Sequence, residues 1–160
     1  MAQNGDGNGN GAEPYSVPFW INGEQVHPQK QFDVISPATG NVIHQCGSAT
    51  EVEVQAAVDA ATTAFKTWKK TLPKERRDIF LKAAEVMKRR SEELGQYMMD
   101  ETGAPRQWAD FNIGVASDFL IDIAGRVSSL EGSIPTTADP NTGALVVREP
   151  FGAILAIAAW

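Results

Sequence analysis

"GAILAIAAW", residues 152–160, is the stretch of sequence that decides the fold. It is a continuous apolar run that begins with a glycine and follows Pro150 and Phe151. The large apolar side chains in and next to it are Phe151, Ile154, Leu155, Ile157 and Trp160. Burying all five is worth ~8–15 kcal/mol, which is about the net stability of a whole domain. The run must therefore pack against other parts of a protein.

The length of this run and its Pro/Gly boundary favour a β-strand that is buried on both faces. Its alanines leave a helix open, because periodicity cannot separate the two in so short a segment. A strand buried on both faces belongs to a parallel sheet that helices cover. The rest of the chain supplies too few strands for such a sheet. The run therefore predicts an α/β fold to which further strands contribute.

Two β-hairpins are predicted before the helices begin. In the first, Asn22-Gly23 separates PFWI from EQVHP, and this dipeptide tolerates the positive φ angles of a tight turn. In the second, Pro37 and Gly40 divide FDVISPATGNVIHQCG, residues 32–47, into two β-branched runs. These hairpins carry no chemistry by themselves.

Four helices are predicted between the hairpins and Gly132. Thr50 and Glu53 form a capping box at the start of the first helix. The second begins at Pro73, and Ser91 is expected to cap the third. Apolar residues recur at helical spacing along all four: Val54, Val58, Ala61, Phe65 and Trp68; Ile79, Phe80, Ala83, Ala84 and Met87; Leu94, Tyr97 and Met98; and Trp108, Phe111, Val115, Phe119 and Ile123.

The boundaries of the last two helices follow from glycine and proline. Gly103 is expected to end the third helix, and Pro105 to start the fourth, which frays near Ser128. After Gly132 the sequence changes to a loop, SIPTTADPNTG, and then to a predicted strand, ALVVREP, that ends at Pro150. The basic cluster Lys88-Arg89-Arg90 suits the negative end of a helix dipole.

Composition limits the class of protein. The 160 residues are 42% hydrophobic and 21% charged, as in globular proteins, and the formal net charge is −6. A negative chain is a poor partner for nucleic acid or an anionic membrane. No apolar run approaches the ~18 residues of a membrane span.

The first thirteen residues are rich in Gly and Asn. They contain no Lys, no Arg and no apolar block, which excludes a secretory signal and predicts a disordered tail over residues 1–13. The single cysteine, Cys46, cannot form an internal disulfide and fits a reducing compartment. We therefore expect a cytoplasmic protein.

Cys46 is the obvious candidate nucleophile, because His44 lies two residues away and would share its strand face. His27, on the neighbouring hairpin, would complete a Cys/His set, but a tetrahedral zinc site needs four ligands. A half-buried strand cysteine beside a surface histidine is the better interpretation. No metal site is predicted.

Carboxylate pairs are the other candidates. Asp118 and Asp122 lie one turn apart, where paired carboxylates can bind a metal, but the apolar residues around them favour the solvated stripe of an amphipathic helix. Asp100 and Glu101 lie near a helix C-terminus, where acids oppose the dipole, so one of them is expected to have a specific partner. The sequence lacks the Gly-rich phosphate loops and the His-Glu-x-x-His motif.

Six motifs follow one another along residues 15–160: FWINGEQV, FDVISPATGNVI, TEVEVQAAVDAATTAFKTW, LPKERRDIFLKAAEVMKRRSEEL, DETGAP and VVREPFGAILAIAAW. Their order resembles the N-terminal part of NAD(P)-dependent aldehyde dehydrogenases. The resemblance implies that residues 14–132 are the N-terminal part of a Rossmann-like cofactor-binding domain. It implies that residues 133–150 form a projecting strand pair used in a homodimer or homotetramer, and that residues 151–160 begin the dinucleotide-binding sheet.

The resemblance also implies a reaction: oxidation of an aldehyde substrate to a carboxylic acid with NAD or NADP. In the family, a cysteine thiolate adds to the aldehyde, a hydride passes to the nicotinamide, and a glutamate activates the water that hydrolyses the thioester. An asparagine helps to bind the oxyanion. None of these three catalytic residues lies within the 160 residues, and Cys46 has no counterpart among them.

The resemblance assigns a cofactor-binding role to Ile157, Ala158, Ala159 and Trp160. This segment lies at the C-terminal end of a sheet strand, where open α/β sheets bind ligands. In the family it lines the nicotinamide-ribose side of the cofactor, largely through backbone atoms. The family usually has proline where Ala159 stands. Alanine keeps the carbonyl, although the loop loses rigidity.

The leading interpretation is therefore an N-terminal fragment of an aldehyde dehydrogenase, inactive as these 160 residues alone. Two alternatives stay open. One is a CoA-acylating semialdehyde dehydrogenase, in which CoA resolves the thioester. The other is a truncated, non-catalytic protein that only binds its full-length relatives.

Overall fold

A computed structural model describes residues 15–158, so the predicted disordered tail lies outside the described residues. The strands form a three-stranded sheet, in the order β1-β5-β4, and the two-stranded hairpin β2–β3. β5 pairs in parallel with β1 and antiparallel with β4. The strands are β1 Ser16–Val17, β2 Phe19–Ile21, β3 Glu24–Val26, β4 Gln31–Ile35 and β5 Val42–Gly47.

Both predicted hairpins are confirmed. Between β2 and β3, Asn22 and Gly23 adopt φ angles of 55° and 79°, the positive pair that a two-residue turn requires. Between β4 and β5, Gly40 adopts φ 73°, and its N–H donates to the Ser36 carbonyl at 2.8 Å. Local turn chemistry is therefore sufficient to fix this part of the chain.

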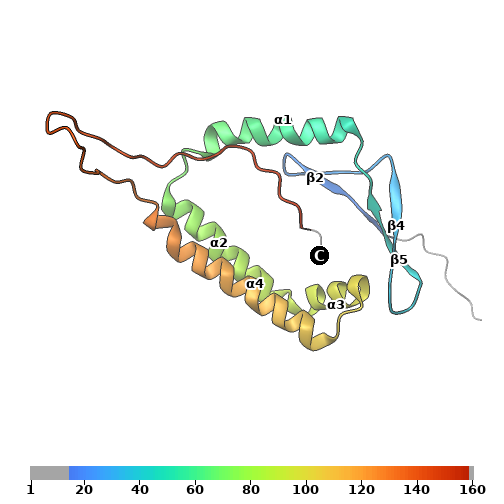
Figure 1. Cartoon of the computed structure of the whole chain (residues 1–160). Helices are drawn as coiled ribbons and strands as arrows, with labels where there is room; N and C mark the ends of the chain where they lie inside the picture. Colours follow the sequence, from blue (N-terminus) through green and yellow to red (C-terminus); the bar gives the residue numbers. More distant parts are fainter. Residues whose placement is uncertain (1–14, 159–160) are drawn as a thin grey trace, which may run out of the picture.

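The described residues contain the four α-helices that the sequence predicts, and a short 3₁₀ turn follows the last of them. They are α1 Glu51–Trp68, α2 Pro73–Arg89, α3 Ser91–Thr102, α4 Arg106–Arg126 and the turn Val127–Ser129. Figure 1 shows α2 and α4 side by side, with α1 on the other side of the molecule next to the β2–β3 hairpin. The chain is thus a mixed α/β protein with two small sheets and a helical layer.

The predicted helix boundaries are confirmed with two corrections of one residue each. Pro105 is the cap of α4, which begins at Arg106. Pro73 is the first residue of α2, and Gly103 ends α3 in the left-handed conformation at φ 70°. Ser91, however, is not the cap of α3 but its first residue, and Arg90 occupies the cap position. The reason is that α2 runs into α3 without a linker: the Arg90 carbonyl accepts from the Leu94 N–H at 2.9 Å.

The predicted Thr50–Glu53 pair closes the start of α1. The Glu53 carboxylate accepts from the Thr50 backbone N–H and from the Thr50 hydroxyl, both at 2.6 Å. These hydrogen bonds hold the pKa of Glu53 below its usual value, the hydroxyl making the larger contribution. One oxygen of the carboxylate, Oε2, is therefore held at the helix start.

Replacing Thr50 with alanine should loosen the first turn of α1. Loss of an N-cap side chain costs about 1 kcal/mol, so hydrogen exchange of the first-turn amides should accelerate severalfold. Thr63→Ala, an exposed site within the same helix, is the matched control and should not accelerate it. Equal effects of the two changes would show that the cap does not hold this helix end.

The core lies between α2 and α4 and is built largely from small residues. Ala84 on α2 is 3% exposed, and Ala109 and Ala124 on α4 are 0% and 1% exposed. Ile113 and Val127 complete the buried apolar set. Small side chains let two helix backbones approach closely, and α2 and α4 make the most extensive contact of any two elements among the described residues.

The prediction of the buried helix faces is only partly right. On α2, Ala84 is buried, but Ile79 and Ala83 of the same predicted face are exposed. On α4 most of the predicted face is exposed, and the buried residues are mainly small ones, with Ile113 as the exception. The exposed set is Trp108, Phe111, Phe119 and Ile123. The apolar stripe of α1 contains no buried residue at all.

Residues 133–150, called the arm below, project away from the helices (Figure 1). Ser133 and Val146 exchange two antiparallel hydrogen bonds of 3.1 and 2.8 Å, and this is an isolated bridge. The predicted strand ALVVREP is therefore wrong as an extended ladder, because the described arm pairs at one position only. Its apolar side chains, among them Ile134, Leu145 and Val147, are exposed.

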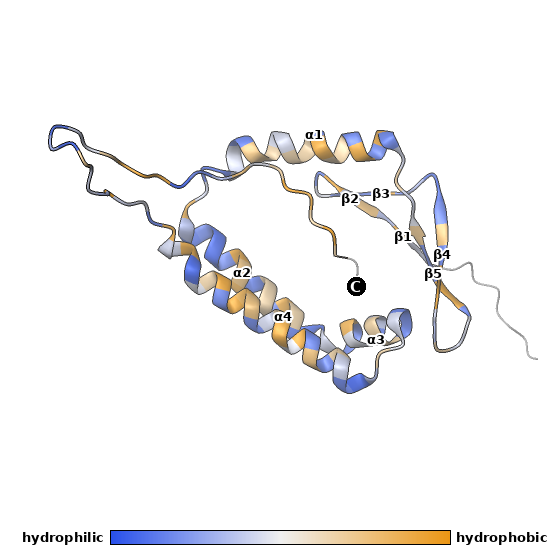
Figure 2. Ribbon diagram, viewed as in Figure 1, coloured by the Kyte–Doolittle hydropathy of each residue, from blue (hydrophilic) through white to orange (hydrophobic). Residues whose placement is uncertain are grey.

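Residues 151–158, called the C-terminal segment below, are not a buried strand, contrary to the prediction. They belong to no strand or helix among the described residues, and Phe151 is 99% exposed. Figure 2 shows the segment as a hydrophobic run that leaves the arm and passes below α1. The physical reason is that no strand in the described part of the chain pairs with it.

Candidate cofactor segment and apolar groove

The C-terminal segment contains the first two of the four residues expected to bind a cofactor. Ile157 is 80% exposed, and Ala158 is exposed as well. Ala159 and Trp160 lie outside the described residues. No backbone–backbone hydrogen bond is formed by any described residue after Val146. The backbone atoms of residues 157 and 158 are thus free to face a ligand.

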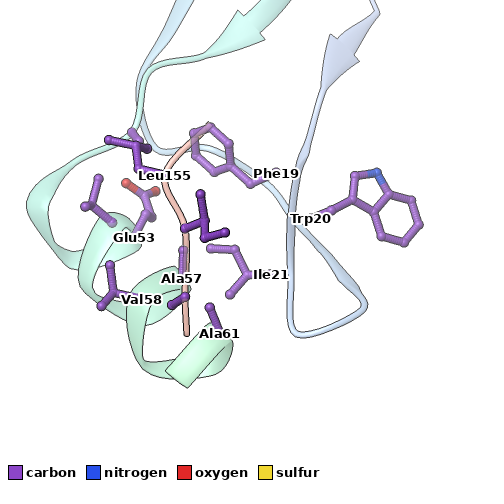
Figure 3. Close-up of a pocket in the computed structure, with 12 residues that line it drawn as sticks. Phe19, Trp20, Ile21, Glu53, Ala57, Val58, Ala61 and Leu155 are labelled. Carbon is purple, nitrogen blue, oxygen red and sulfur yellow. The ribbon is translucent and has the colours of Figure 1, made fainter. Parts of the chain in front are cut away.

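An apolar groove of about 650 Å³ lies where the C-terminal segment passes α1 and β2. Its lining residues are Phe19, Trp20, Ile21, Ala49, Glu53, Val54, Ala57, Val58, Ala61, Ala153, Ile154 and Leu155. Figure 3 shows Phe19 and Ile21 pointing toward α1 and the C-terminal segment, whereas Trp20 points away. This alternation along β2 is the period-2 pattern of a strand.

The groove is a packing surface and not a catalytic centre. Glu53 is its one ionisable lining residue, and its carboxylate is already bound to Thr50. The apolar stripe predicted for α1 supplies Val54, Val58 and Ala61 to the groove. The contribution of the β2–β3 hairpin was not predicted, although the period-2 alternation of Phe19, Trp20 and Ile21 indicates which side chains share a face.

Cys46 does not lie in an arrangement that activates a thiol. It is half-buried on β5, and burial together with the negative charge of Glu101 raises its pKa. His44, the expected base, instead places Nε2 3.2 Å from the Glu101 carboxylate. Because a nucleophilic cysteine needs a lowered pKa, the geometry opposes that role.

One of the two acids near the end of α3 was expected to have a specific partner. The acid is Glu101, and its partner is His44. Their contact joins β5 to α3, and the His44 side chain is 15% exposed. The neighbouring acid, Asp100, accepts a hydrogen bond from Gln96 at 2.7 Å within α3. Glu101 is therefore the acid that links the sheet to the helices.

Replacing Glu101 with glutamine should lower the pKa of the Cys46 thiol, because it removes a nearby negative charge that disfavours the thiolate. The pH dependence of the alkylation rate of Cys46 measures this shift. Asp100→Asn, which removes a charge from the adjacent residue, should leave the profile in place. An unchanged or raised thiol pKa in Glu101→Gln would contradict the assigned electrostatics.

The other candidate residues lie apart from the groove. His27 is exposed on the turn after β3. Asp118 and Asp122 are exposed on α4, and the Asp122 carboxylate accepts from Arg126 at 2.7 Å. Within residues 15–158, no group of three or more His, Cys, Asp or Glu side chains is placed so that it could hold a metal ion. Among the same residues, no helix combines the length and the hydropathy of a membrane span.

An ion pair that the sequence did not predict joins α3 to α4. Arg106 at the start of α4 donates two hydrogen bonds to Glu92 of α3, at 2.7 and 2.6 Å, and a third to Asp110 at 2.8 Å. The planar guanidinium group can form this bidentate contact with a carboxylate. The spacing of four residues between Arg106 and Asp110 indicates an ion pair on one helix. No such spacing relates Arg106 to Glu92, because Glu92 lies on another helix.

The family model, the relatives and the solved structures that match this chain all belong to one family. Residues 20–160 match the model of the aldehyde dehydrogenase family. A vanillin dehydrogenase of a Pseudomonas species is 34% identical over 148 residues, which are 91% of this chain and 31% of that protein. A salicylaldehyde dehydrogenase of Pseudomonas putida is 33% identical over 141 residues, 88% of this chain and 29% of that protein.

Solved structures agree. A salicylaldehyde dehydrogenase from Pseudomonas putida, complexed with salicylaldehyde, matches with a TM-score of 0.80 at 29% identity, covering 85% of this chain and 28% of that one. An NAD-dependent benzaldehyde dehydrogenase from Corynebacterium glutamicum matches with a TM-score of 0.73 at 26% identity, covering 84% and 29%. The chain spans about three tenths of the length of these relatives. It belongs to the aldehyde dehydrogenase family.

Proposed function

We propose that this chain is part of an enzyme that oxidises an aldehyde to a carboxylic acid with NAD or NADP. The family match over residues 20–160 carries the proposal. A similar solved structure is described as NAD-dependent, which supports a nicotinamide cofactor. In such a reaction the cofactor accepts the hydride that leaves the aldehyde carbon.

The residues of the C-terminal segment fit a cofactor contact made through the backbone. Ile157 and Ala158 are exposed and form no backbone–backbone hydrogen bond with another described residue. Their part is to bind and orient the nicotinamide-ribose side of the cofactor together with Ala159 and Trp160. The nucleophile, base and oxyanion donor of the family are not among the 160 residues, and Cys46 does not replace them.

Aromatic aldehydes are the first substrates to test. Vanillin, salicylaldehyde and benzaldehyde are the substrates named for three of the similar proteins. We propose this class for the whole enzyme because the described part of the chain matches those proteins over most of its length. The groove beside the C-terminal segment makes no contribution to this choice, since it faces the packing side of α1.

The arm is proposed to mediate a homodimer or homotetramer. Its exposed apolar side chains and its single bridge leave the backbone edges of both arm segments available for pairing. We also propose a cytoplasmic location, consistent with a single half-buried cysteine that forms no disulfide.

The activity test uses the protein as its source produces it. Absorbance at 340 nm should rise when NAD⁺ or NADP⁺ is mixed with one of the three aromatic aldehydes, and CoA should not be required. The 160-residue chain alone should give no signal. Reduction by the isolated chain, or no reduction by the natural protein with any aldehyde, would overturn the proposal. A strict CoA requirement would favour an acylating enzyme.

A further inference from the structure

Asn22 and Gly23 form the two-residue turn between β2 and β3, and both residues are exposed. An asparagine followed by a glycine can react with itself, because the backbone nitrogen of the glycine can attack the side-chain carbonyl carbon of the asparagine and close a five-membered ring. A side chain on the second residue would crowd this nitrogen, and glycine has none. The reaction needs no other residue of the protein.

The hairpin does not tie up the attacking nitrogen. The β2–β3 ladder ends at the pair Ile21 and Glu24, so the two turn residues lie outside it. Neither the Gly23 N–H nor the Asn22 side-chain amide forms a hydrogen bond with another described residue. Both groups face water, and no hydrogen bond has to break before they react.

A hollow of about 350 Å³ lies beside this turn and gives it room to move. The turn lines one side of the hollow together with β2, and small side chains of α1 line the other. The lining residues are Trp20, Ile21, Asn22, Gly23, Ala57, Ala60, Ala61 and Ala64. A Cβ atom built at Gly23 would meet nothing within 4 Å. The Asn22 side chain therefore has space to turn toward the Gly23 nitrogen and close the ring.

We propose that Asn22 deamidates spontaneously in the folded protein. The Gly23 nitrogen gives up its proton to hydroxide and bonds to Cγ of Asn22. The C–N bond of the side-chain amide then breaks, and its nitrogen takes a proton from water and leaves as ammonia. Water adds to one of the two carbonyls of the resulting succinimide and reopens the ring. One ring opening gives aspartate at position 22, and the other gives isoaspartate.

The reaction should open the hairpin. Isoaspartate adds one carbon atom to the main chain of a turn that Asn22 and Gly23 now close with φ angles of 55° and 79°. Both products also place a carboxylate beside the hollow, whose lining residues include no Lys, Arg or His. β2 and β3 pair over only three residues each, and an isolated two-stranded hairpin is marginally stable. The hairpin therefore depends on its turn.

Mass spectrometry of peptides from the natural protein, incubated in mildly alkaline buffer, tests the site. The peptide with Asn22 should gain the mass difference between an amide and an acid, and isoaspartyl methyltransferase should label part of the product. Asn41 is the matched control: it is exposed as well, but the β-branched Val42 follows it and crowds the attacking nitrogen. A gain at Asn22 no larger than that at Asn41, or a gain without isoaspartate, would overturn the proposal.

Asn22→Gly separates the reaction from the turn. Gly-Gly closes the same kind of turn and has no side chain that can form the ring. Hydrogen exchange of the amides of residues 24–26 should accelerate severalfold in the incubated natural protein, whereas incubated Asn22→Gly should keep its initial rates. Unchanged exchange in the deamidated protein, or equal acceleration in the variant, would contradict the proposed opening. Neither measurement needs an aldehyde or a cofactor, so both are independent of the proposed function.

Discussion

Replacing Ala84 with aspartate should unfold the helical layer, whereas the same change at Ala83 should leave it folded. Ala84 is 3% exposed where α2 packs on α4, and Ala83, its neighbour on the same helix, is exposed. An unpaired buried charge costs about 3–5 kcal/mol. That cost is a large part of the ~5–15 kcal/mol that holds a domain together.

Circular dichroism during urea unfolding measures the difference between the two variants. Ala84→Asp should lose the cooperative transition or move its midpoint far toward zero urea. Ala83→Asp should change the midpoint only slightly. Equal midpoints would show that α2 does not pack on α4 through this face.

Gly132→Val should separate the two segments of the arm. A Cβ atom at Gly132 would collide with the backbone carbonyl of Val146, and this carbonyl accepts the hydrogen bond from Ser133. Relieving such a collision costs about 1–3 kcal/mol. The two hydrogen bonds of the bridge together contribute about 1–3 kcal/mol, so the collision is large enough to offset them. Because the colliding atom is the backbone carbonyl oxygen of the bridge itself, the bridge should open.

Gly143→Val is the control, because a Cβ atom there meets nothing within 4 Å and Gly143 has no positive φ angle. The amide of Val146 should exchange with solvent much faster in Gly132→Val than in the control. If the arm mediates assembly, sedimentation should show a weakened oligomer in Gly132→Val alone. Unchanged exchange at Val146 would contradict the described bridge.

Features set by neighbouring residues were predictable from the sequence. Asn22-Gly23 and Gly40 fix their turns through positive φ angles, and Pro73 and Gly103 fix helix ends through the missing N–H and the missing Cβ. These effects act within a few residues. They do not depend on what the element later packs against.

Features set by distant partners were not predictable. Periodicity marks the large apolar residues of α4, but the buried ones include small residues, Ala109 and Ala124. The predicted strand after Gly152 needs neighbouring strands, and no strand of the described chain pairs with it. In the same way, an acid near the end of α3 could be expected to find a partner, but only the fold shows that the acid is Glu101 and the partner is His44.

The cofactor segment is the central claim, and a crystal structure of the natural protein with NAD⁺ tests it most directly. We expect the nicotinamide ribose against the backbone of Ile157 and Ala158. A structure in which NAD⁺ binds far from these residues would contradict the account.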